Sequence, residues 1–89
     1  MKAVFINQYG GPDALTYGEY PDPVAGPGEV LVRVAAAGIN PIDIAERSGV
    51  MKEFRPIQFP GILGWDFSGT IAGLGAGTSG FSVGDKVFG

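Results

Sequence analysis

The sequence predicts a mainly β fold, a small barrel or sandwich with one short helix. The chain has 89 residues, and its 16 glycines and 7 prolines divide the apolar segments into pieces too short for long helices. Glycine recurs every two to five residues over residues 61–89, a spacing typical of short, closely packed strands. Only one segment carries both a helix start signal and a helix stop signal. A chain of this length is expected to form one domain.

Five segments are expected to form strands, and each is bounded by turn residues. They are residues 1–6, 15–20, 30–37 and 67–74, and a short strand that begins at 87–88 and is expected to lack a partner, because no further strand follows it. The third is the strongest, because Val30, Val32 and Val34 alternate onto one face. Residues 50–61 should be irregular, since Pro56 and Pro60 prevent regular pairing.

The helix is expected over residues 41–48. Asn40 suits the N-cap, Pro41 suits the first helical position, and Asp43 places a carboxylate in the first turn. Gly49 then ends the helix. Side chains at such a strand-to-helix corner are well placed to hold a ligand as well as to cap the helix.

Composition excludes several classes of function. The six Lys and Arg residues are scattered and the net charge is −3, so a nucleic-acid partner is not expected. The chain contains no Cys and no His, which excludes disulfides, thiolate or imidazole metal sites, and Ser-His or Cys-His nucleophiles. We therefore expect no metal. No apolar run is long enough for a signal peptide or a membrane span, so a cytoplasmic protein is the expectation.

The glycine-rich end contains a literal G-x-G-x-x-G at Gly75, Gly77 and Gly80. A dinucleotide-binding loop needs a helix directly after this motif, and residues 81–85 read FSVGD, which is no helix start. We interpret residues 75–80 as a loop between strands. Asp85 is expected to bond backbone within its own turn.

The segment GWDFSG, residues 64–69, places Trp65 and Asp66 beside glycines. Two interpretations are open: Trp65 belongs to the core and Asp66 caps a turn, or both line a binding site.

These segments, in this order, resemble the medium-chain dehydrogenase/reductase superfamily, and among its branches the zinc-free, zeta-crystallin-like quinone oxidoreductases. The resemblance rests on three segments in register: MKAVFINQYGGPDAL, GPGEVLVRVAAAGINPIDIAERSG and PGILGWDFSGTIAGLGAGTSGFSVGDKVFG. It implies a GroES-like β-barrel, followed in the family by a Rossmann domain that this chain does not contain. Residues 1–89 would then be the N-terminal part of the GroES-like catalytic domain of a longer enzyme. On its own, this fragment is expected to be inactive and to self-associate.

Zinc-dependent members carry a Cys and a His as metal ligands in two of these segments. In this sequence Asn40 falls at the Cys position and Trp65 at the His position. The resemblance therefore implies metal-free hydride transfer from NADPH, or NADH, to a quinone or another conjugated carbonyl.

The resemblance also suggests roles for individual residues. Asn40 and Asp43 are the expected catalytic residues, and Asn40 and Arg47 the expected cofactor contacts. Trp65 and Asp66 are expected in the substrate pocket. Some relatives have a Tyr two residues after the position of Asp43. This chain has Ala45 there, so any contact by that ring is lost.

Two alternatives remain at this point. One is an enoyl-thioester reductase of the same superfamily. The other is a non-catalytic GroES-like binding or assembly module, which would need a long mobile arm; residues 50–61 are short and contain two prolines. For the full-length enzyme the expected state is a homodimer.

Overall fold

The computed structural model describes all residues from Met1 to Gly89. The chain divides into two compact units. The first unit comprises Met1–Pro21 and Ile39–Trp65, and the second comprises Asp22–Gly38 and Asp66–Gly89. Each unit has its own sheet, and the fold is mainly β with one short helix, as predicted.

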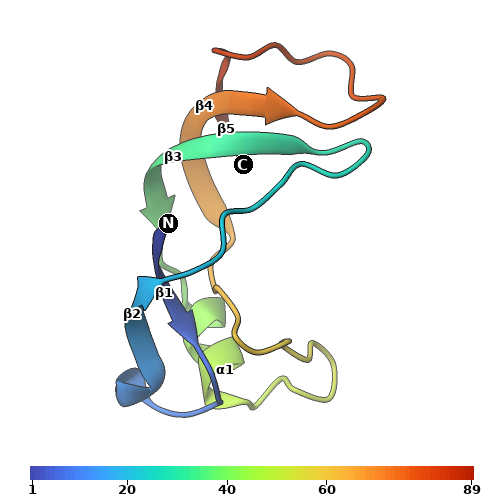
Figure 1. Ribbon diagram of the computed structural model, residues 1–89. Helices are drawn as coiled ribbons and strands as arrows, with labels where there is room; N and C mark the ends of the chain where they lie inside the picture. The colour runs from blue at the N-terminus through green and yellow to red at the C-terminus, as the bar shows by residue number, and fades with distance from the viewer. The chain divides into compact units, whose positions relative to one another are not determined.

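The sheet of the first unit is a two-stranded antiparallel hairpin (Figure 1). Strand β1 (Lys2–Ile6) pairs with β2 (Leu15–Glu19), and a 3-10 turn, η1 (Pro12–Ala14), precedes β2. Ile6 at the end of β1 is completely buried. Its backbone N–H and C=O both bond to Gly61, each at 2.9 Å, so the irregular segment before Gly61 is fixed to the hairpin.

Helix α1 (Pro41–Ser48) has the predicted limits. Asn40 has extended backbone geometry at the N-cap, and Gly49 ends the helix in the left-handed region with φ of 87°. The last turn is held to the loop after β1, where the backbone N–H of Gly10 donates to the carbonyl of Arg47 at 2.9 Å. No helix of this structure has the length and apolar character needed to cross a membrane.

The second unit contains a three-stranded antiparallel sheet in the order β3-β4-β5. Strands β3 (Val30–Gly38) and β4 (Asp66–Leu74) are long and visibly curved in Figure 1. Their register shifts twice, between Leu31 and Val32 and between Val34 and Ala36, as bulges that bend paired strands do. Ile71 on β4 is 1% exposed and forms the centre of this unit.

Strand β5 (Lys86–Phe88) differs from the expectation of a strand begun without a partner. It pairs antiparallel with β4, with Ser68 opposite Phe88 and Thr70 opposite Lys86. The partner of β5 lies upstream in the chain, because the long loop after β4 returns the chain to its own sheet. The loop over residues 75–80 is confirmed, and Asp85 Oδ2 accepts the backbone N–H of Ser82 at 2.9 Å within its turn.

Candidate functional site

The start of α1 joins two of the predicted site residues. The backbone N–H of Asn40 donates to Oδ2 of Asp43 at 2.9 Å, which is the return bond of a capping box. The backbone N–H of Asp43 in turn donates to the carbonyl of Asn40 at 2.9 Å. The two residues are therefore locked to each other, and the strand-to-helix corner is rigid.

The other carboxylate oxygen of Asp43 is buried and accepts no hydrogen bond. Buried carboxylate oxygens normally have a donor, because an unpaired one loses the solvation it had in water. Oδ1 of Asp43 is thus a buried acceptor without a donor, beside the N-cap residue Asn40.

Replacement of Asp43 by alanine is expected to destabilise the protein by about 1 kcal/mol, since the N-cap N–H loses its partner. Asp43→Asn keeps a side-chain oxygen for that bond and should lose less unfolding free energy. Urea unfolding of the two variants and the parent measures the difference. Equal losses for both variants would contradict the capping role.

Trp65 is held through its ring and its N–H. It follows Gly64, which adopts φ of 121°, and its side chain is about half exposed, at 50%. Its indole Nε1–H donates to Oε1 of Glu46 on α1 at 2.6 Å, and the guanidinium carbon of Arg55 lies 4.3 Å from the ring centroid. Within residues 1–89 Trp65 is therefore not a core residue: its ring is half exposed and is held at one edge and on one face.

Two members of this cluster, Glu46 and Arg55, were not predicted from the sequence. Glu46 is only 9% exposed, although it lies on a short helix with polar neighbours. A signal was available for it, because Glu46 lies three residues after Asp43 and such pairs share a helix face. Arg55 lies in the irregular segment, where no periodicity indicates the direction of a side chain.

The remaining predicted residues lie elsewhere. Arg47 is at the last turn of α1, and its Nε donates to the carbonyl of Gly10 at 3.3 Å, which ties the helix to the first unit's hairpin. Asp66 is the first residue of β4 in the second unit, exposed and opposite Gly38 in the register. Within the first unit the structure thus brings Asn40 together with Asp43, and Trp65 together with Glu46 and Arg55.

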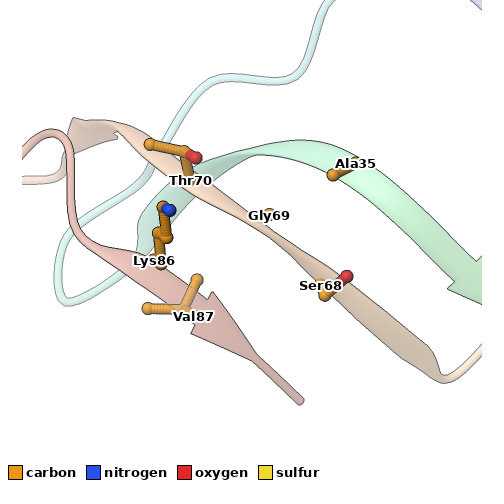
Figure 2. A pocket seen from close by; sticks show the side chains of 6 residues that line it. All are labelled: Ala35, Ser68, Gly69, Thr70, Lys86 and Val87. Carbon is orange, nitrogen blue, oxygen red and sulfur yellow. The ribbon is translucent and has the colours of Figure 1, made fainter.

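The second unit has an open hollow of about 240 Å³ on its sheet (Figure 2). Its lining comprises Ala35, Ser68, Gly69, Thr70, Lys86 and Val87. None of the predicted site residues is among them. Among residues 1–89, no three Asp or Glu side chains lie together as a group that could hold a metal ion.

Comparison with known families identifies the fold. Residues 26–89 match the family described as the alcohol dehydrogenase GroES-like domain. The chain belongs to this family. The matched GroES-like region contains β3, α1, β4 and β5, together with all five predicted site residues.

Similar proteins are mainly quinone oxidoreductases. The chain is 38% identical over 88 residues to the chloroplastic quinone-oxidoreductase QR1 of Triphysaria versicolor, covering 98% of this chain and 27% of that protein. It superimposes with a TM-score of 0.88 and 30% identity on the Escherichia coli quinone oxidoreductase complexed with NADPH, covering 99% of this chain and 26% of that one. The structure of an NAD-dependent alcohol dehydrogenase superimposes with a TM-score of 0.88 and 40% identity, covering 99% of this chain and 25% of that one.

The GroES-like chain therefore spans only about a quarter of the length of these proteins. The cofactors named for two of the solved structures are both nicotinamide dinucleotides, but they differ in type. Three of the relatives are named as chloroplast proteins.

Proposed function

We propose that residues 1–89 form the N-terminal part of the GroES-like catalytic domain of a longer NAD(P)H-dependent oxidoreductase. The reaction is hydride transfer to a quinone or another conjugated carbonyl, without zinc. One observation carries the proposal: an amide and a carboxylate, Asn40 and Asp43, are locked together at the first turn of α1, and one carboxylate oxygen, Oδ1 of Asp43, is left without a donor. The likeness to quinone oxidoreductases supports it.

When bound, a reduced nicotinamide supplies a hydride, and the conjugated carbonyl that accepts it gains negative charge on oxygen. Without a metal, that charge must be met by hydrogen-bond donors. The Asn40 side chain carries both donors and an acceptor, so it can orient either the carbonyl or a carboxamide. Because its backbone is fixed by Asp43, the side chain starts from a defined position.

Asp43 contributes an acceptor and not a donor. Its Oδ1 is buried without a hydrogen bond, which fits the N–H₂ of a nicotinamide carboxamide or an ordered water. In this role Asp43 fixes the orientation of the group that it accepts from, and through Oδ2 the position of Asn40.

Trp65 provides a flat apolar surface suited to an aromatic or quinonoid ring, since it is half exposed and its edge is anchored. Asp66 stays a proposed pocket residue and Arg47 a proposed cofactor contact. The bond from Arg47 to Gly10 also gives it a structural task, so its replacement should affect stability as well.

More polypeptide is proposed to cover these units. Only Ile6 and Ile71 are completely buried, whereas Ile39, Phe54 and Phe88 are 87%, 84% and 88% exposed. Large apolar side chains left open in this number are typical of surfaces that pack against further structure. We accordingly propose that residues 1–89 alone are inactive and self-associate, and that the full-length enzyme is a homodimer. We also propose that the full-length enzyme is cytoplasmic.

The substrate class is tested by following NADPH and NADH oxidation by the full-length protein with three acceptors: a benzoquinone, a conjugated enone and an enoyl thioester. The proposal predicts turnover with the first two and at least about tenfold lower kcat/KM with the thioester. Preference for the thioester would move the protein to the enoyl-reductase alternative. Nicotinamide binding without turnover on any acceptor would favour the non-catalytic module.

A further inference from the structure

Glu46 is a buried carboxylate that the proposed reaction does not use. It is the one charged side chain among the buried residues, and its oxygen Oε1 accepts the indole N–H of Trp65 at 2.6 Å. We propose that Glu46 is a positioning residue: it fixes the plane of the Trp65 ring, with Arg55 stacked on it, so that a flat substrate meets a preset surface. This inference rests on the proposed function, in which Trp65 contacts the substrate.

The geometry favours positioning over simple packing. An indole N–H points outward in the plane of the ring, so a partner at this atom restrains rotation of the ring about its two side-chain torsions. The acceptor is a carboxylate, and hydrogen bonds to charged acceptors are shorter and stronger than neutral ones. The helix that carries Glu46 is itself fixed by Asn40, Asp43 and Gly49.

Arg55 restrains the same ring from a different direction. Its guanidinium carbon lies 4.3 Å from the ring centroid, within the range of a cation–π contact. The guanidinium therefore covers one face of the indole, which leaves the opposite face for a flat ligand. A ring held at its edge and on one face loses little conformational freedom when a substrate stacks on it, and this lowers the cost of binding.

The test uses the full-length protein, 1,4-benzoquinone and four variants: Trp65→Phe, Glu46→Leu, Glu46→Gln and the double variant Trp65→Phe/Glu46→Leu. Glu53→Leu serves as control, since it removes an exposed carboxylate outside the cluster. Two readouts are taken. One is the steady-state KM and kcat, and the other is quenching of Trp65 emission by the quinone, obtained by subtracting the spectrum of the Trp65→Phe protein.

We expect Glu46→Leu to raise KM for the quinone about fivefold, with kcat within about twofold, and to weaken quenching by a similar factor. Glu46→Gln keeps the side-chain shape and an acceptor oxygen, so its KM and its quenching should both lie close to those of the parent. In the Trp65→Phe background, Glu46→Leu should raise KM for the quinone by less than about twofold further, because Glu46 acts through the indole. Glu53→Leu should match the parent.

The outcomes separate this inference from the proposed function. If Trp65→Phe leaves KM unchanged and the quinone does not quench Trp65 emission in the parent, the substrate does not meet Trp65, and that part of the proposed function is wrong. If Trp65→Phe raises KM but Glu46→Leu does not, or if Glu46→Leu adds its full effect without the indole, the positioning role is wrong alone. Should Glu46→Leu fail to fold, Glu46→Ala carries the test, because alanine removes the acceptor and suits a helix. Unchanged quenching and an unchanged KM in that variant would overturn the inference.

Discussion

Replacement of Gly69 by alanine is expected to cost roughly 2–4 kcal/mol of unfolding free energy. Gly69 lies on β4 opposite Val34, close to one of the shifts in register. A Cβ at this position would overlap the backbone carbonyl oxygen of Arg33 and lie 2.8 Å from Cγ1 of Val32. The carbonyl belongs to the neighbouring strand, so it cannot move without disturbing the sheet.

Gly18→Ala is the matched control. Gly18 is also a strand glycine, on β2, but a Cβ there would meet no atom within 4 Å. Its replacement should be neutral or slightly stabilising, because alanine has less backbone entropy to lose on folding. The midpoint of urea unfolding compares the two variants in the full-length protein. Equal midpoints would show that β3 and β4 are not so closely packed at Gly69.

Replacement of Asn40 by alanine is expected to reduce kcat about 100-fold, a loss comparable with removal of a donor to a developing oxyanion. The stability loss should be only about 1 kcal/mol, because the helix loses an N-cap side chain but keeps Asp43. Turnover with benzoquinone and the urea midpoint are measured on the same preparations.

Asn40→Ser separates the two roles of this residue. Serine caps a helix about as well as asparagine, so stability should stay close to that of the parent. It lacks the amide, which cannot then orient a carbonyl or a carboxamide, and kcat should remain low. A serine variant with full turnover would reduce Asn40 to a helix cap.

The elements of this fold could be predicted from the sequence because their signals are local. Pro41 and Gly49 mark the limits of α1, and alternating valines mark β3. The capping pair Asn40 and Asp43 was visible for the same reason, since the two residues are three apart and bond directly.

The cluster around Trp65 could not be predicted in this way. Glu46 and Trp65 are 19 residues apart, and their hydrogen bond depends on how the irregular segment between α1 and β4 returns. Without that path, an aromatic residue beside glycines is most simply placed in the core. The pairing of β5 with β4 was missed on similar grounds, because strand partners are set by the loop between them.

The most direct test of the account is quinone-dependent NADPH oxidation by the full-length enzyme, measured before and after exhaustive treatment with a zinc chelator, with the metal content determined in parallel. We predict that kcat and KM are unchanged by the chelator and that the protein holds less than stoichiometric zinc. Loss of turnover on chelation, with recovery on adding zinc back, would contradict this prediction, because a metal and not the Asn40 amide would then meet the charge on the substrate.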